Sequence, residues 1–126
     1  PHPAGQLYTG TFHRLCLRAA HTLTDPASIR ILSARHGLLD LATMVAPYDT
    51  RLTDHEAITA SELREQAYRT GLIDHAPVVV LAATAYVRLA RIVWPHAAAP
   101  LLGARGIGEQ QQRLAQMIRD HQKTVS

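Results

Sequence analysis

An uninterrupted apolar run, Val78 to Ala82, constrains the fold of this chain more than any other feature of its sequence. A strand that is apolar at every position is typical of a parallel sheet whose two faces are both covered by helices. The segment Ile29 to Ala34 is short, mostly apolar and β-branched at its start, and it also favours a strand. Between them, residues 53–56 (TDHE) match a capping box, and helical residues continue to Thr70, before Gly71. Strand, helix and strand in this order predict a right-handed crossover.

Apolar residues at spacings of three and four predict three further helices, over residues 12–23, 84–94 and 109–121. Together with the strands, they predict a small three-layer α/β domain over residues 1–126, with a short, mainly parallel sheet flanked by helices. Such domains normally start with a strand, whereas this chain begins at Pro1 and enters a helix almost at once. The sequence therefore leaves open whether a first strand is missing.

Composition excludes several classes of protein. At 126 residues the chain has room for one domain with a core that needs no metal or disulfide. Cys16 is the single cysteine, so no internal disulfide can form, and the histidines show no metal-ligand spacing. No apolar run approaches the roughly 18 residues that span a bilayer, and the first residues do not resemble a signal peptide. We therefore expect no metal, no cofactor, no membrane partner and a cytoplasmic location.

The loop from Ser33 to Asp49 holds the densest group of polar side chains near one edge of the expected sheet. His36 directly follows the expected end of a strand, where ligands of α/β sheets gather, and a histidine can exchange protons near neutral pH. Ser33, His36 and Asp49 supply the residue types of a catalytic triad, although such residues also occur in purely structural loops. The residues expected to bind a ligand beside them are Arg35, Gly37 and Tyr48.

A glycine turn, residues 103–108 (GARGIG), precedes the last expected helix. The turn lacks the lysine and hydroxyl of a phosphate loop, but the free amides at a helix start attract anions. Gly106, Gly108 and Gln110 are therefore expected to contact a ligand phosphate, with a purely structural turn as the alternative. The formal charge of +3 comes almost wholly from scattered arginines, which suit an anionic partner but form no dense basic tract.

Three segments resemble an uncharacterised domain family found in bacteria and phages: QLYTGTFHR, ILSARHGLLDLATMVAPYDTRL and PLLGARGIGEQQQRL. That family is similar in turn to the YaaA peroxide-stress family, which has a comparable S-A-x-x-G-L-L…P-Y segment. The resemblance implies a nucleobase, nucleotide or DNA ligand, because YaaA-like proteins are linked to DNA protection and DNA binding. It also adds Tyr8 and Thr9 to the expected ligand-binding residues. The positions that match the family's motifs are Tyr8 and Thr9, Ser33, His36 and Gly37, Pro47 to Asp49, and Gly106, Gly108 and Gln110.

We therefore predict a nucleotide- or nucleobase-handling domain, with glycosidic-bond chemistry in nucleic-acid modification as its candidate reaction. One alternative is a non-enzymatic DNA-binding or stress-response module. Another is a structural partner domain, in which a second copy or another chain pairs with an exposed sheet edge. The sequence does not decide whether the protein is an enzyme. The arginines that would serve DNA binding on helix faces are Arg88, Arg91, Arg105 and Arg113.

Overall fold

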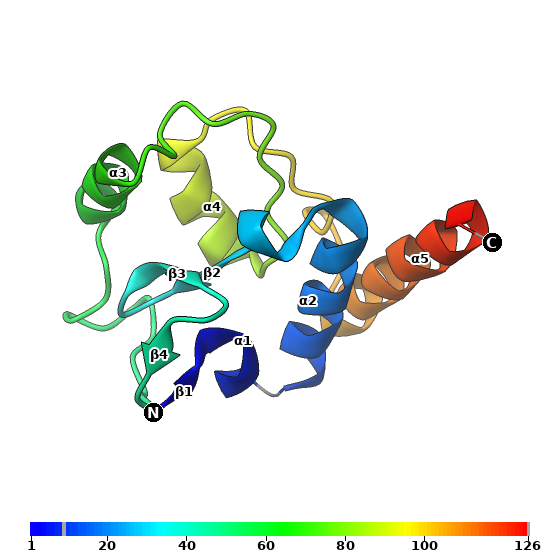
Figure 1. Ribbon diagram of the computed structural model, residues 1–126, viewed down its shortest axis with the longest axis horizontal. Helices are drawn as coiled ribbons and strands as arrows, with labels where there is room; N and C mark the ends of the chain where they lie inside the picture. Colours follow the sequence, from blue (N-terminus) through cyan, green and yellow to red (C-terminus); the bar gives the residue numbers. More distant parts are fainter. Residues whose placement is uncertain (9, 126) are drawn as a thin grey trace.

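Helices make up most of the ordered structure, and the strands are few and short (Figure 1). The computed structural model describes residues 1–8 and 10–125. The helices are α1 (Ala4–Leu7), α2 (Thr11–Leu23), α3 (Ala60–Arg69), α4 (Thr84–Val93) and α5 (Ile107–Val125), with a 3-10 turn at Pro26–Ser28. The strands are β1 (His2–Pro3), β2 (Arg30–Ser33), β3 (Gly37–Asp40) and β4 (Met44–Val45).

The expected three-layer α/β domain with a mainly parallel sheet is wrong. Within the described residues, the sheets are two antiparallel pairs, β1 with β4 and β2 with β3. In the longer pair the register runs from Arg30 opposite Asp40 to Ser33 opposite Gly37. Gly37 has φ +72°, a conformation that glycine adopts without strain, and it turns the chain back directly after β2. This local hairpin makes β2 antiparallel to its neighbour before the chain reaches α3.

The apolar run Val78–Ala82 does not form the expected continuous strand. Val79 makes a single parallel bridge with Ala98. The Ala98 N–H donates to the Val78 carbonyl (2.9 Å), and the Val80 N–H donates to the Ala98 carbonyl (2.8 Å). Val79 is 44% exposed. The run is therefore not covered on both faces, and the expected strand–helix–strand crossover is absent from the described residues.

The start of α3 differs from the expected capping box at residues 53–56. Thr59 is the N-cap: its hydroxyl accepts the Glu62 N–H (3.1 Å), and the Glu62 carboxylate accepts the Thr59 N–H (3.0 Å). Both segments match the capping pattern, but the second also places Ile58 before the cap and Leu63 after the first turn. These two residues pack in the same core cluster, as a hydrophobic staple requires. The staple stabilises the start of the helix at Thr59.

The core of the described residues consists of three separate clusters rather than one continuous layer. The α3–α4 cluster contains Leu63 and Trp94. The α2–α5 cluster contains Ala19 and Leu114, both fully buried. The hairpin cluster, around Leu39, joins β3 to β4 and α1. The hairpin therefore has a small core of its own.

Figure 1 shows α5 on the side of the molecule away from the hairpin, where it packs against α2 and projects outward. The α5 residues Leu114 and Ile118 are buried in the α2–α5 cluster, so α5 is an amphipathic surface helix. Among the helices of residues 1–8 and 10–125, none is both long and apolar enough to cross a membrane.

Candidate functional site

The turn of the β2–β3 hairpin positions the candidate site, and one side chain of α3 holds this turn. Gln66 Nε2 donates to the His36 carbonyl (3.0 Å), and Gln66 Oε1 accepts the Leu38 N–H (2.8 Å). A Cβ at Gly37 would lie 2.5 Å from Gln66 Oε1. Glycine is therefore needed at this position for its positive φ and for the close approach of Gln66.

Ser33 is a buried polar residue at the end of β2, with 2% of its surface exposed. Its Oγ accepts the N–H of Arg35 (3.1 Å) and the N–H of His36 (3.0 Å). The same oxygen lies 2.6 Å from the hydroxyl of Tyr48. Since a serine oxygen has two lone pairs, the two amide bonds leave the Ser33 O–H to donate to Tyr48. Ser33 therefore orients Tyr48, and its oxygen keeps no free lone pair in this arrangement.

Tyr48 extends this hydrogen-bond chain to Tyr8, because the hydroxyls of Tyr48 and Tyr8 are hydrogen-bonded to each other. Tyr48 already accepts from Ser33, so its own proton is available for donation to Tyr8. Burial raises the pKa of Tyr8, and the hydrogen bond with Tyr48 raises this pKa further, so the phenol stays protonated at neutral pH. The outer end of the chain of three hydroxyls is therefore a hydrogen-bond donor.

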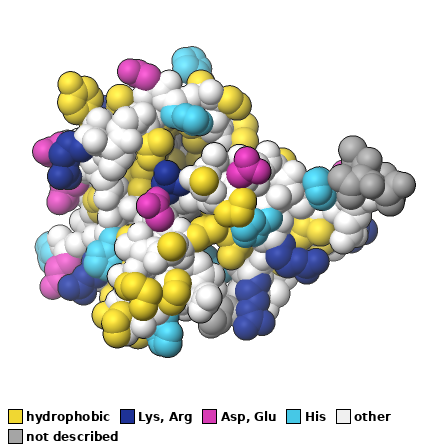
Figure 2. Space-filling model, viewed as in Figure 1, with side chains coloured by type: hydrophobic (Ala, Val, Ile, Leu, Met, Phe, Trp, Pro, Cys, Tyr) yellow, Lys and Arg dark blue, Asp and Glu magenta, His cyan; other side chains and the backbone are white. Residues whose placement is uncertain are grey.

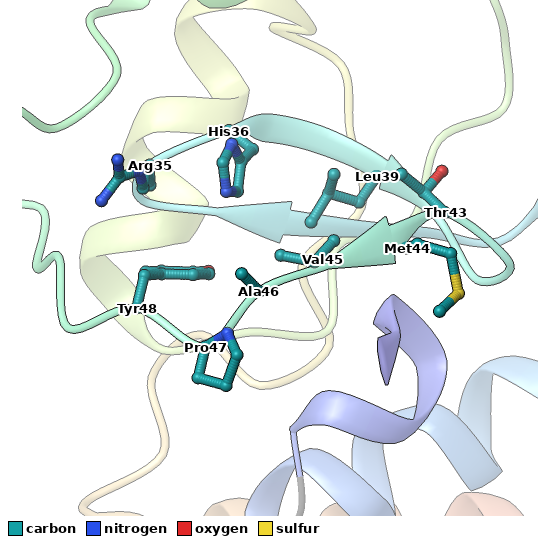
Figure 3. A pocket seen from close by; sticks show the side chains of 9 residues that line it. All are labelled: Arg35, His36, Leu39, Thr43, Met44, Val45, Ala46, Pro47 and Tyr48. Carbon is teal, nitrogen blue, oxygen red and sulfur yellow. The ribbon is translucent and has the colours of Figure 1, made fainter. Parts of the chain in front are cut away.

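A cavity of about 280 Å³ opens beside the hairpin turn (Figure 3), and we call it the turn cavity. Arg35 and His36 lie together at the tip of the hairpin, with Tyr48 facing them from the segment that follows β4. The rings of His36 and Tyr48 meet edge to face, with centroids 5.3 Å apart and planes at 88°. The residues that line the turn cavity are Arg35, His36, Leu39, Thr43, Met44, Val45, Ala46, Pro47 and Tyr48.

Arg35 brings a positive charge to the turn cavity. Its exposed guanidinium makes no hydrogen bond or ion pair within the described residues. Arg30, in the same hairpin, is instead paired with Asp40 at 2.8 Å. A free guanidinium can bind a phosphate or carboxylate through two parallel hydrogen bonds. The turn cavity therefore combines an available cation with the rings of His36 and Tyr48.

The expected triad is not joined by side-chain hydrogen bonds. Ser33 meets His36 through the backbone amide of His36, while the imidazole lies against the ring of Tyr48. Asp49 is exposed, and no hydrogen bond among the described residues joins its carboxylate to Ser33 or His36. The structure thus brings Ser33, His36 and Tyr48 together and leaves Asp49 outside this group. Their catalytic roles stay predictions.

The glycine segment 103–108, whose last two residues form the start of α5, lies apart from the turn cavity. Gly106 and Gly108 are exposed, and the half-buried Gln110 donates its backbone N–H to the Gly106 carbonyl (3.0 Å). Helix α5 packs against α2, and none of the three residues lines the turn cavity. Thr9 lies outside the described residues. A phosphate contact at these positions stays a prediction.

A larger cavity of about 500 Å³ lies between α2 and the segment Val78–Ala82, and we call it the long cavity. Tyr8 lines the long cavity, whereas its partner Tyr48 lines the turn cavity. Cys16 and His13 also line the long cavity. Burial raises the pKa of Cys16 to about 12 and lowers the pKa of His13. The surroundings of the long cavity therefore favour the neutral forms of the Tyr8 phenol, the His13 imidazole and the Cys16 thiol.

Two parts of the site were not expected from the sequence. Gln66 is one of several polar residues on the amphipathic helix α3, and no local pattern distinguishes it as a partner of a distant turn. Thr43 and Met44, at the far end of the turn cavity, flank the start of a very short strand. The available signal was Gly37, because a glycine within an apolar strand marks a close approach of other atoms.

In the part of the chain that the structure describes, no group of three or more His, Cys, Asp or Glu side chains is arranged to hold a metal ion. Both cavities are lined instead by apolar side chains with a few neutral or cationic groups. The ligand chemistry therefore has to be argued from Arg35, the rings and the hydroxyls.

Comparison with known proteins gives two matches. The model of a family of unknown function, DUF6884, matches residues 1–116. The uncharacterized protein YfjM of Bacillus subtilis (strain 168) is 34% identical over 126 residues, which cover 95% of this chain and 83% of the relative. No solved structure gives a significant match. The two matches support an uncharacterised family, and the finer resemblance to YaaA stays a prediction. The chain belongs to DUF6884, a family of unknown function.

Proposed function

We propose that this protein binds a nucleotide or a nucleobase in the turn cavity. The observation that carries the proposal is the unpaired guanidinium of Arg35 at the end of the cavity where the rings of His36 and Tyr48 face each other. Proteins stack bases on aromatic side chains and hold phosphates in the fork of a guanidinium. A ligand with one flat ring and one anionic group fits this combination.

The size and rigidity of the turn cavity support the same class of ligand. Its volume of about 280 Å³ lies just below the roughly 300–1,000 Å³ range of small-molecule sites. A single nucleoside or mononucleotide is therefore a better fit than a longer ligand. Ser33 fixes Tyr48, and Gln66 fixes the backbone on both sides of Gly37. Because these groups are already ordered, binding would cost little conformational entropy.

A reaction at a glycosidic bond would use the same residues. In nucleoside hydrolysis the bond from the anomeric carbon to the base nitrogen breaks, water supplies the new carbon–oxygen bond, and the departing base receives a proton. His36 would deliver that proton from the rim of the turn cavity and would regain one from the attacking water. Ser33 would act as a positioning residue, through Tyr48.

Titration of isotope-labelled protein with AMP, adenosine and inorganic phosphate, followed by NMR, tests the binding. We expect AMP to shift the amide resonances of His36 and Tyr48. Arg35→Gln should weaken AMP binding about tenfold, because one charge-assisted pair with the phosphate is lost. Adenosine has no phosphate, so its affinity should change much less. Arg69→Gln changes an exposed arginine of α3 and should leave both ligands unaffected.

Two results would contradict this proposal. One is the absence of any shift at His36 and Tyr48 with the four common mononucleotides at millimolar concentration. The other is equal AMP affinity in Arg35→Gln and Arg69→Gln. The reaction is tested separately, by chromatography of nucleosides incubated with the protein, because binding without release of free base would leave the site as a binding site only.

DNA binding is a second candidate function, but three of its four expected arginines are engaged within the chain. Arg105 pairs with the Glu109 carboxylate at 3.7 Å. Arg91 and Arg113 donate to backbone carbonyls at 3.0 to 3.1 Å. Figure 2 shows basic side chains gathered at the lower right instead, over α2 and α5, and Arg14 and Arg18 are exposed on α2. Binding of duplex DNA through this face would weaken steeply with added salt, so an affinity that does not change with salt would exclude it.

A further inference from the structure

The turn that carries Arg35 and His36 is held on both of its sides by groups outside the turn. On the side that follows β2, the buried Ser33 Oγ accepts the N–H of Arg35 (3.1 Å) and the N–H of His36 (3.0 Å). The Ala34 carbonyl accepts the N–H of Ile58 (2.7 Å), which lies directly before the N-cap of α3. Figure 3 shows the Arg35 and His36 side chains extending from this end of the hairpin. The side that leads into β3 is held by a different contact.

Gln66 of α3 holds the side of the turn that leads into β3. Its Nε2 donates to the His36 carbonyl (3.0 Å), and its Oε1 accepts the Leu38 N–H (2.8 Å). These two backbone groups flank Gly37, and a Cβ at Gly37 would lie 2.5 Å from the same Oε1. A side-chain amide offers the same donor and acceptor as a peptide group. Gln66 therefore pairs with the outer edge of the turn in the way that a neighbouring strand would.

Helix α3 gives Gln66 a fixed base. The capping box at Thr59 stabilises the start of this helix. Leu63, three residues before Gln66, and Ala67, directly after it, are both fully buried in the α3–α4 cluster. Leu38 packs against the same cluster, and its N–H is the one that Gln66 accepts. The position of the turn relative to α3 is therefore determined at Gln66.

The guanidinium of Arg35 has no contact of its own that fixes its place, because it makes no hydrogen bond or ion pair within the described residues. The backbone of the turn therefore decides where the guanidinium can reach. Tyr48, by contrast, is held through its hydroxyl, 2.6 Å from Ser33 Oγ. A change at Gln66 would therefore alter the position of the positive charge relative to the ring of Tyr48.

We propose that Gln66 is a positioning residue for the phosphate of the bound nucleotide, and that it acts through Arg35. This role rests on the proposed function, because it concerns the same turn cavity. Without Gln66 the turn would sample several positions, and a bound phosphate would have to order the turn as well as the arginine side chain. Such ordering lowers affinity. With Gln66 in place the turn is ordered before the ligand arrives, so binding orders little more than the guanidinium.

NMR titration of four proteins with AMP and adenosine tests this role: the wild type, Gln66→Met, Arg35→Gln and the double variant. Methionine is as long as glutamine but lacks its amide. We expect Gln66→Met to weaken AMP binding about three- to tenfold and to change the adenosine affinity less. In the Arg35→Gln background, Gln66→Met should change the AMP affinity no more than the adenosine affinity. A residue that only stabilises the fold would change both affinities alike, with or without Arg35. Gln112→Met, the same change at an exposed position of α5, is the control and should alter neither affinity.

Hydrogen exchange tests the attachment without any ligand. Gln66→Met should make the Leu38 amide exchange at least about tenfold faster than in the wild type, because this N–H loses its partner, and Gln112→Met should not. If Gln66→Met does not fold, Gln66→Asn keeps the amide but is too short to reach both backbone groups. It should show the same loss of affinity for AMP relative to adenosine.

Failure of this role and failure of the proposed function give different results. If AMP binds the wild type and Arg35→Gln weakens it while Gln66→Met does not, Gln66 is not a positioning residue and the proposed function stands. Equal losses for AMP and adenosine, or an unchanged exchange rate at Leu38, also overturn the role of Gln66 alone. If AMP does not bind the wild type, the proposed function is wrong, and the role of Gln66 is wrong with it.

Discussion

Gly37 and Gln66 make a contact that a larger side chain at residue 37 would prevent, because a Cβ there would lie 2.5 Å from Gln66 Oε1. The same oxygen accepts the Leu38 N–H at 2.8 Å, and the amide nitrogen of Gln66 donates to the His36 carbonyl. The turn that carries Arg35 and His36 is therefore attached to α3, an element of a different core cluster. The geometry of the turn cavity depends on this attachment.

The first prediction concerns Gly37→Ala. We expect it to lower the free energy of unfolding by about 2–3 kcal/mol, since a positive φ costs an L-residue about 1–2 kcal/mol and displaced hydrogen bonds about 1 kcal/mol. Gly71→Ala is the control, because Gly71 also has a positive φ but a Cβ there would meet no atom within 4 Å. Urea unfolding of both variants checks this. Equal losses in both would mean that the contact with Gln66 contributes nothing.

The second prediction concerns Ser33→Ala. Removing the hydroxyl leaves the amides of Arg35 and His36 and the Tyr48 hydroxyl without their buried partner, so we expect a loss of about 1–3 kcal/mol in the free energy of unfolding. Tyr48→Phe should cost less, and the double variant should cost less than the sum of the two. Ser61→Ala, at an exposed position of α3, is the control. Additive losses would show that Ser33 and Tyr48 do not depend on each other.

The third prediction concerns the reactivity of Cys16. Burial raises the pKa of this thiol to about 12, so very little thiolate is present at pH 8. We expect iodoacetamide to alkylate the folded protein at least about tenfold more slowly than the urea-unfolded protein at this pH. Mass spectrometry over time measures both rates. Equal rates would show that the thiol is open to solvent and that the α2–α5 cluster is less well packed than described.

The fourth prediction concerns His13 and acid. Burial lowers the pKa of His13 below its ordinary value of 6.5, so the folded protein binds a proton less readily than the unfolded chain. The stability due to the neutral imidazole is therefore present above about pH 6.5 and is lost as the pH falls below it. His13→Gln should make the free energy of unfolding less dependent on pH between 7.5 and 5, by a small amount because the side chain stays partly exposed. His21→Gln, at an exposed position of the same helix, is the matched control, and identical curves for both variants would contradict the prediction.

Local signals in the sequence predicted the helices better than the sheets. Apolar spacing indicated residues 12–23 and 84–94, close to α2 and α4. A strand at residues 29–34 is also present, as β2. The partner of that strand could not be predicted in the same way, because the hairpin depends on the positive φ of Gly37 and on a contact with Gln66. Pairing between strands depends on tertiary contacts. The sequence of an apolar run such as Val78–Ala82 therefore does not indicate which segment pairs with it.

The candidate site was predictable where its residues are close in sequence. Arg35 and His36 follow a strand directly, and Tyr48 lies in the same polar loop, and all three line the turn cavity. The family resemblance added Tyr8 to the expected ligand-binding residues, and the Tyr8 hydroxyl is hydrogen-bonded to the Tyr48 hydroxyl. Gln66 could not be found, because a glutamine on a polar helix face gives no sign of which distant backbone it binds.

The division of the core into three clusters has a consequence for how the molecule opens. The buried residues of each cluster pack mainly against one another. The unfolding of one cluster therefore removes few apolar contacts from the other two. We expect hydrogen exchange to reveal α2 with α5, and α3 with α4, as separate cooperative units of different stability.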